Sequence, residues 1–252
     1  MFAHDTIQAM LQGKKALVTG AGRGVGVAIA RLLAAEGATV AVAYRASKES
    51  AETLAEEIGG VALQADLMDT AQAERLVAEA FATLGGLDIL VNNAAGFGPL
   101  KPLAEYTWDE IDTEWQAVVK PVITVTRAAL PHFQAQKSGK IVNLSATLLQ
   151  RPAPGQGAHA MAKAAVLAYT RSLAREVGPE GITVNAVSPG MALTEFSESL
   201  PEALKAAVAE RTPLRRLATP EDVARAVLFF CSPLSDFITG ANLAPDGGLA
   251  VL

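Results

Sequence analysis

The clearest candidate for chemistry in this chain is the pair His159 and Lys163, within G-A-H-A-M-A-K-A-A at 157–165. Residues four apart on a helix lie on one face, so the imidazole and the ammonium group would stand side by side. The pKa of an unperturbed imidazole is about 6.5, and even a neutral ring can donate one N–H. The pair therefore predicts a site for proton transfer or carbonyl polarisation, or a histidine that only fills space.

A second chemical signal is the glycine-rich turn T-G-A-G-R-G-V-G at 19–26. It follows a short apolar run at 16–19 and opens a helical pattern at 25–36. Glycines let the backbone approach a pyrophosphate closely, and a helix N-terminus offers N–H groups and a positive dipole to the anion. The cradle is expected to consist of Gly20, Arg23, Gly24, Val25 and Gly26.

The rest of the chain alternates between two kinds of segment. Short runs rich in Val, Ile and Leu predict strands at 16–19, 38–43, 61–64, 87–91, 140–144, 182–187 and 242–244. Ala/Leu/Glu/Arg segments predict helices at 25–36, 48–58, 70–84, 103–136, 159–177 and 220–231. Strands without polar alternation suggest a sheet covered on both faces, and strand–helix alternation implies parallel strands. The sequence thus predicts an α/β fold.

The domain organisation is predicted to be simple: an N-terminal extension at 1–13 and one domain at 14–252. The stretch 191–218 interrupts the alternation with prolines and a short helix pattern, so we interpret it as a flap over the substrate site. Trp108 and Trp115 stand seven residues apart in a helical pattern and are predicted to serve packing rather than to line the pocket.

Composition excludes several classes of function. The 252 residues carry a net charge of −5 and no basic face, which argues against a nucleic-acid partner. The sequence contains no run of about 18 apolar residues, so no membrane span is predicted. Cys231 is the only cysteine, so an intrachain disulfide is impossible, and a cytoplasmic location is predicted. No metal site is predicted.

Five motifs carry a family resemblance. After T-G-x-x-x-G-x-G come Asp66-Leu67, N-N-A-A-G at 92–96, S-P-G-M-A-L-T at 188–194 and D-G-G at 246–248. In this order they resemble the short-chain dehydrogenase/reductase family. Two further segments, at 211–224 and 237–240, are similar to its 3-oxoacyl-carrier-protein reductase-like branch. The resemblance implies a Rossmann-type doubly wound parallel sheet in a single domain, a nicotinamide cofactor and a homotetramer.

The resemblance also assigns cofactor contacts by position. Asp66 and Leu67 are expected at the adenine, and Lys163 at the ribose. Asn93, Ala94 and Ala95 are expected to line the ribose as well. The carboxamide end of the cofactor is expected to meet Pro189, Gly190 and Thr194.

The choice between nicotinamides depends on the end of the second strand. An acidic residue there would bind the ribose hydroxyls of NAD, but the sequence reads A-Y-R-A-S at 43–47. Beside Tyr44, Arg45 is placed to meet a 2′-phosphate together with Arg23, and Ser47 is a further donor. NADP(H) is therefore favoured over NAD(H), the alternative being that Arg45 is only a solvated residue.

The catalytic centre departs from the family, which normally uses Asn, Ser, Tyr and Lys. Lys163 is present, but His159 stands in place of the tyrosine, Ala146 in place of the serine and Val118 in place of the asparagine. Ser145 lies one position too early. Because one step along a strand turns a side chain to the opposite face, we interpret Ser145 as a buried structural residue.

These residues favour an NADP(H)-dependent reductase of a carbonyl on a small or acyl-type substrate, with Lys163 holding the ribose and His159 assisting the substrate oxygen. The substrate pocket is predicted to include Phe97, Ala146, Leu148, Pro154, His159 and Met191. One alternative is reduction of a conjugated C=C, because S-A-T-L at 145–148 is similar to dienoyl reductases. The other is a non-redox enzyme, or an inactive partner, that keeps the cofactor site.

Overall fold

A single parallel sheet organises the molecule. In the computed structural model, which describes residues 9–251, seven strands follow the order β3-β2-β1-β4-β5-β6-β7. They are β1 (Lys15–Val18), β2 (Thr39–Tyr44), β3 (Val61–Gln64), β4 (Ile89–Asn92), β5 (Gly139–Leu144), β6 (Ile182–Val187) and β7 (Asn242–Leu243). The chain moves outward from β1 to β3 and then returns to β4 beside β1. This reversal is the topological switch point of a doubly wound fold, so the predicted α/β class is confirmed.

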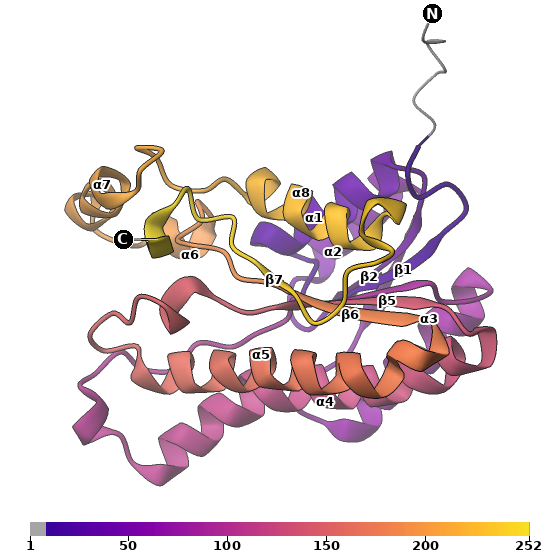
Figure 1. Cartoon of the computed structure of the whole chain (residues 1–252), viewed down its shortest axis with the longest axis horizontal. Helices are drawn as coiled ribbons and strands as arrows, with labels where there is room; N and C mark the ends of the chain where they lie inside the picture. The colour runs from indigo at the N-terminus through magenta and orange to yellow at the C-terminus, as the bar shows by residue number, and fades with distance from the viewer. Residues whose placement is uncertain (1–8, 252) are drawn as a thin grey trace, which may run out of the picture.

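Helices cover both faces of the sheet (Figure 1). One face carries α1 (Gly24–Ala35), α2 (Lys48–Ile58) and α8 (Pro220–Cys231), and the other carries α3 (Thr70–Leu84), α4 (Trp108–Gln136) and α5 (Gly157–Val177). Alternate residues of β2 enter different cores: Val40 and Val42 pack toward α1, whereas Ala41 and Ala43 pack toward α3. Both faces are therefore buried, which explains why the strands lack polar alternation.

The predicted helix at 103–136 divides into two elements. A 3₁₀ turn, η1 (Leu103–Glu105), comes first, and α4 then begins after Thr107. Thr107 and Glu110 form a capping box, in which Thr107 N–H donates to the Glu110 carboxylate at 2.8 Å and Glu110 N–H donates to Thr107 Oγ1 at 3.3 Å. This cap, rather than the apolar pattern, sets where the helix begins.

Trp108 and Trp115, predicted to serve packing rather than the pocket, do not line the cleft described below, but they are not part of the core either. Trp108 is 83% exposed and Trp115 is 43% exposed. The buried stripe of α4 runs through Glu114, Val118 and Val122 instead. Since one residue turns a helix by about 100°, the two tryptophans share a face that is rotated away from the sheet.

Buried amides tie the two long helices to the sheet. Asn92 Nδ2 on β4 donates to Thr126 Oγ1 on α4 at 2.9 Å and to Asn143 Oδ1 on β5 at 2.8 Å. Asn143 Nδ2 in turn donates to Thr170 Oγ1 on α5 at 2.9 Å. Because buried polar groups are costly unless they are paired, this network fixes α4 and α5 relative to the strand ends.

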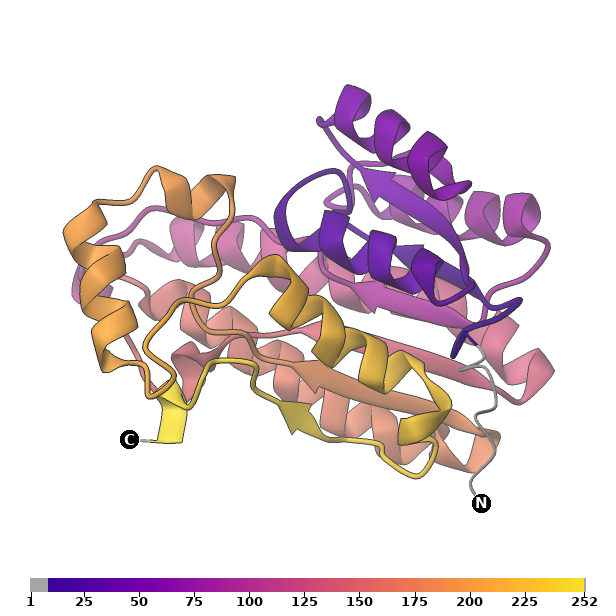
Figure 2. The ribbon, with the colours of Figure 1, turned by 90° about the horizontal axis from the view of Figure 1, so that it is seen from above.

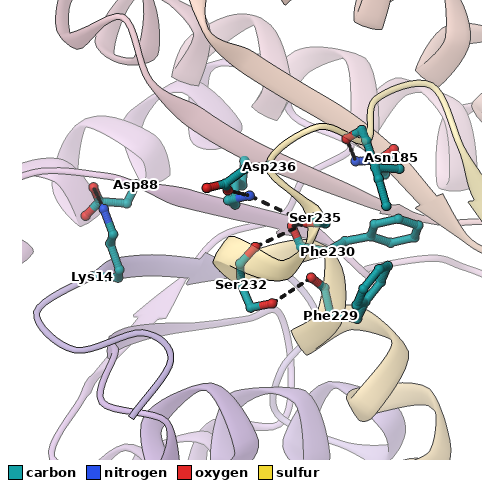
Figure 3. A network of polar contacts seen from close by, with 10 residues as sticks. Lys14, Asp88, Asn185, Phe229, Phe230, Ser232, Ser235 and Asp236 are labelled. Carbon is teal, nitrogen blue, oxygen red and sulfur yellow. Dashed lines mark hydrogen bonds and ion pairs between the residues drawn. The ribbon is translucent and has the colours of Figure 1, made fainter. Parts of the chain in front are cut away.

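A separate polar network secures the amino ends of the strands (Figure 3). Lys140 Nζ pairs with Asp236 at 2.7 Å, and Ser235 Oγ donates to the carbonyl of Phe230 at 3.0 Å. Both aspartate and serine lie at or beside η4 (Pro233–Ser235), which follows α8. Cys231 is buried here, and burial raises the pKa of its thiol to about 12, so this end of the molecule serves structure.

The segment 191–218, predicted to be a flap, contains α6 (Glu195–Glu198) and α7 (Glu202–Arg211) and projects at one end of the molecule (Figure 2). Its two ends are joined by backbone hydrogen bonds: Leu193 N–H donates to the carbonyl of Ala218, and Ala218 N–H donates to the carbonyl of Met191. Of the predicted extension, residues 1–8 lie outside the described residues, whereas Leu11 is buried against the core.

Every helix within residues 9–251 is too short or too polar to span a membrane.

Candidate active site

A cleft of about 620 Å³ opens at the carboxyl ends of the strands, where the strand order reverses. Crevices at this position are the usual ligand sites of open α/β sheets. The cleft brings together most of the residues that the sequence singled out. Its wall includes Gly20, Arg23, Gly24, Val25, Gly26, Tyr44, Arg45, Ser47, Asp66, Leu67, Asn93, Ala94, Ala95, Phe97, His159, Lys163 and Thr194.

Six predicted site residues are not on this wall: Ala146, Leu148, Pro154, Pro189, Gly190 and Met191. Gly190 and Met191 instead line a separate cavity of about 10 Å³ under the flap. The carbonyl of Pro189 accepts hydrogen bonds from the backbone N–H and the hydroxyl of Thr147, at 3.1 and 3.2 Å. The cofactor and substrate roles given to these six residues stay predictions.

Two positions of the turn after β1 admit only glycine. Gly20 has a φ of +64°, and a Cβ there would lie 2.8 Å from the Cα of Ala94. A Cβ on Gly26 would lie 2.8 Å from both Ala21 Cα and Asn93 Nδ2. Because real Cβ atoms do not approach other atoms so closely, both positions exclude any side chain, and the backbone itself forms the floor of the cleft.

The start of α1 fits an anion. Its N-cap residue, Arg23, makes no side-chain capping hydrogen bond, whereas α3 begins with Asp69, whose carboxylate accepts from two backbone N–H groups. The first turn of α1 therefore has no acceptor from its own N-cap side chain, and its residues Gly24, Val25 and Gly26 line the cleft, where a phosphate group would meet their N–H groups.

One acidic side chain from the flap approaches this turn. Gly24 N–H donates to Glu195 Oε1 at 3.4 Å, and Glu195 lines the cleft beside Thr194. This contact is not evident from the sequence pattern, because 171 residues separate the two partners. It places a negative charge beside the N–H groups that would receive a pyrophosphate.

Asn93 has a structural task in addition to its place on the wall. Its Nδ2 donates to the carbonyls of Thr19 and Gly20, both at 3.0 Å, and its backbone N–H donates to Thr19 Oγ1 at 3.0 Å. The residue after β4 thus holds the turn after β1 in shape.

The end of the cleft beside β2 carries two cationic side chains at its rim. Arg23 and Arg45 are both exposed, and the end of β2 carries no acid. The backbone of Arg45 is held in place, since Gln64 Nε2 donates to its carbonyl at 2.9 Å. Asp66 lies across the rim, where its Oδ1 accepts from Met68 N–H at 3.0 Å.

At the opposite end of the cleft, His159 and Lys163 stand one turn apart on α5, and both are buried. The ring of His159 is held by Glu114 on α4, with 2.5 Å between Nδ1 and Oε1. The other carboxylate oxygen, Oε2, accepts from Gly98 N–H at 2.7 Å. The ring of Phe97 packs on the imidazole with 4.3 Å between centroids. With Nδ1 engaged, Nε2 is the ring nitrogen left for a molecule in the cleft.

Lys163 is fully enclosed at the base of the cleft. Its Nζ donates to the carbonyl of Leu144 at 2.8 Å. Burial lowers the pKa of this amine to about 8, and the nearby charge of Glu114 opposes that shift. Ser145, the residue after Leu144, is buried, and its hydroxyl donates to the carbonyl of Lys163 at 3.0 Å. This is the structural role that the sequence predicted.

Glu114 is the functional candidate that the sequence analysis missed. It is 3% exposed and lies 45 residues before His159. The available signal was an acid on the apolar stripe of α4, one turn before Val118, where a carboxylate cannot be buried without a partner. The sequence alone could not name that partner, because it is on another helix.

In the described part of the chain, no group of three or more His, Cys, Asp or Glu side chains is arranged to hold a metal ion.

Comparisons with known proteins identify the class. A family model described as "Enoyl-(Acyl carrier protein) reductase" matches residues 20–250. The chain is 39% identical over 248 residues to a 3-oxoacyl-(acyl-carrier-protein) reductase, FabG, of Staphylococcus aureus, covering 95% of this chain and 99% of the relative. The chain therefore belongs to the short-chain dehydrogenase/reductase family and, with it, to the NAD(P)-dependent oxidoreductases.

Two solved structures are similar throughout. A short-chain dehydrogenase from Burkholderia cenocepacia, in complex with NADP, is 38% identical with a TM-score of 0.88, covering 96% of this chain and all of the other. A double mutant of a Serratia marcescens short-chain dehydrogenase/reductase is 36% identical with the same TM-score, covering 96% of this chain and 99% of the other. The likeness supports the Rossmann-type fold over nearly the full length.

Proposed function

We propose that this protein is an NADP(H)-dependent reductase of a carbonyl group on a small or acyl-type substrate, in which His159 acts where the family uses tyrosine. The observation that carries the proposal is one continuous cleft. At one end it has a glycine turn and a helix N-terminus whose N-cap side chain makes no capping hydrogen bond, and at the other it has His159 and Lys163. When bound, NADPH would supply the hydride.

The residues present fit a dinucleotide with a 2′-phosphate. The N–H groups at the start of α1 would receive the pyrophosphate, and Lys163 would hold the ribose next to the nicotinamide. The guanidinium groups of Arg23 and Arg45 would meet the extra phosphate, since guanidinium binds phosphate through paired hydrogen bonds. The NADP complex of the Burkholderia relative supports the same choice.

On the substrate side, His159 is the donor that the cleft offers. A carbonyl oxygen against Nε2 would receive a hydrogen bond and, as hydride reaches the carbonyl carbon, the proton itself, so that the product is an alcohol. Imidazole reaches about 2 Å less far than a phenol, so the substrate must lie deeper than it would beside a tyrosine. The name of the FabG relative, a 3-oxoacyl-(acyl-carrier-protein) reductase, supports an acyl-type substrate.

The test of the cofactor compares NADPH with NADH binding in the wild type and in Arg45→Ala. Removing a charge-assisted phosphate contact should weaken NADPH binding about tenfold and leave NADH binding within about twofold. Tighter binding of NADH than NADPH by the wild type would refute the choice of NADP(H).

The test of the reaction measures NADPH oxidation with a matched panel of ketones and enones, in the wild type and in His159→Ala. We expect ketone reduction and a loss of at least about 100-fold in kcat on removal of the ring. Turnover that is unchanged in His159→Ala would refute the role of the histidine.

A second function, reduction of a conjugated C=C, is favoured by one observation: Ala146 provides no hydroxyl donor to hold a ketone oxygen next to the reacting carbon. Preference for enones in the same panel would select it. If only the Ala146→Ser/His159→Tyr double variant turned over, the chain would be a cofactor-binding protein that has lost this reaction. The proposed homotetramer is tested by size-exclusion chromatography with light scattering.

A further inference from the structure

We propose that Glu114 is a positioning residue that acts through His159, holding the imidazole so that Nε2 carries the transferable proton. The proposal rests on the function proposed above. Glu114 comes from α4 and His159 from α5, and 2.5 Å separates Oε1 from Nδ1. Both side chains are buried, so water does not compete for this contact.

The contact determines which ring nitrogen bears which proton. A carboxylate oxygen can only accept, so the hydrogen between Oε1 and Nδ1 occupies the Nδ1 side of the ring. A neutral imidazole with its proton on Nδ1 has only a lone pair at Nε2 and cannot donate to a carbonyl. The donor form is therefore the imidazolium, and the neutral-ring donor that the sequence analysis considered is replaced by a His159–Glu114 ion pair.

In proton transfer from this pair, every proton, charge and electron pair is accounted for. In the loaded state the ring carries protons on Nδ1 and Nε2, and Glu114 carries the compensating negative charge. When the Nε2–H bond breaks, the proton goes to the substrate oxygen, and the electron pair stays on Nε2. The ring is then neutral with its proton on Nδ1, still hydrogen-bonded to Glu114, and Nε2 can be reprotonated from solvent.

The buried basic groups around Glu114 require a negative charge to balance them. His159 and Lys163 are two basic groups one turn apart in a buried site, and Glu114 is the acid that faces both. A buried cation without a counter-charge is strongly destabilising. Glu114 thus lets the ring be protonated next to the lysine.

The carboxylate is itself fixed in orientation. Gly98 N–H donates to Oε2 at 2.7 Å, and a Cβ on Gly98 would lie 2.5 Å from the same oxygen. Phe97 packs against the imidazole on the adjoining side. The loop after β4 therefore contacts both Glu114 and His159, as a positioning role requires.

The test is a double-mutant cycle of His159→Ala and Glu114→Gln with the best ketone of the panel. Glu114→Gln removes the charge at nearly constant shape. If Glu114 acts through the ring, kcat falls at least about tenfold in the wild-type background and does not fall further in the His159→Ala background. Asp112→Asn, which removes an exposed charge from the same helix, is the control and should leave kcat unchanged.

A spectroscopic readout separates positioning from stability. The chain has three histidines, so His159→Ala assigns the ring nitrogens of residue 159 in ¹⁵N NMR spectra. The neutral ring should carry its proton on Nδ1 in the wild type and shift toward the Nε2 tautomer in Glu114→Gln. Gly98→Ala should cause a smaller shift and a smaller loss of kcat in the same direction, which keeps the proposal testable if Glu114→Gln does not fold.

The outcomes are distinguishable. If His159→Ala has no effect, the proposed function itself fails. If His159→Ala lowers kcat but Glu114→Gln leaves kcat and the tautomer unchanged, only the positioning role is overturned. Equal losses from Glu114→Gln in both backgrounds would also overturn it.

Discussion

The two ends of the cleft are built in different ways. The proposed phosphate end has a floor of backbone from one contiguous segment, 19–26, in which Gly20 and Gly26 leave no space for a side chain. The proposed proton-transfer end is formed by side chains from two helices, with Glu114 and His159 separated by 45 residues. One end depends on backbone shape and the other on the choice of side chain.

This difference fits the prediction from the sequence that one end keeps the family pattern and the other departs from it. A side chain added at Gly26 would open the turn and displace Asn93 with it. On α5, by contrast, His159 stands where the family resemblance predicts tyrosine, and its ring has Glu114 as a partner. The structure supplies that partner one turn before Val118, the position at which the resemblance expects asparagine.

The largest expected effect breaks the phosphate end alone. Gly26→Ala should raise the Kd for NADPH at least about 100-fold, because the added Cβ meets Ala21 and Asn93 at 2.8 Å and the turn must open. Fluorescence titration of NADPH measures it. Gly178→Ala is the matched control, since a Cβ there meets nothing within 4 Å and should leave the Kd unchanged. Equal NADPH affinity of Gly26→Ala and the wild type would remove the backbone argument.

The next effect concerns Lys163, which serves both ends. Lys163→Met should abolish turnover yet raise the free energy of unfolding at pH 7 by about 2 kcal/mol, because burying the charged amine costs more than its bond to Leu144 returns. The measurement is chemical denaturation of both proteins at several pH values.

The pH dependence of that difference follows from the pKa of Lys163. Burial lowers the pKa to about 8 in the folded protein, against 10.5 for the ordinary amine. Below pH 8 both states bind the proton and the full cost is present. As pH rises from 8 to 10.5, only the unfolded state stays protonated, so the wild type gains stability. The advantage of Lys163→Met should shrink over this window, and an advantage that is constant with pH would contradict the assignment.

The smallest expected effect concerns the contact between the flap and the phosphate end. Glu195→Gln should tighten NADPH binding about threefold at low salt, since a carboxylate beside Gly24 N–H repels an incoming pyrophosphate. Glu198→Gln, on the same short helix, should have no effect on the Kd. Weaker binding by Glu195→Gln would instead mean that the carboxylate helps to order the site.

Much of the fold could be read from local pattern. The predicted strands at 61–64 and 182–187 and the predicted helices at 48–58, 70–84 and 220–231 agree with the observed bounds. The largest error in an element was the helix predicted to begin at 103, because a capping box rather than hydrophobic periodicity sets its start. Backbone sterics and periodicity act over a few residues, and these are the properties that a sequence displays directly.

By itself, the sequence determined the glycine turn, the parallel sheet and the placing of His159 one turn before Lys163, because each follows from neighbours along the chain. Only the tertiary structure decided that Glu114 meets His159, that Glu195 meets Gly24 and that the two tryptophans of α4 face outward. Those outcomes depend on how helices are rotated and packed against one sheet, and a rotation of one residue moves a side chain by about 100°. The proton-transfer role that we propose therefore rests on a contact that local pattern does not specify.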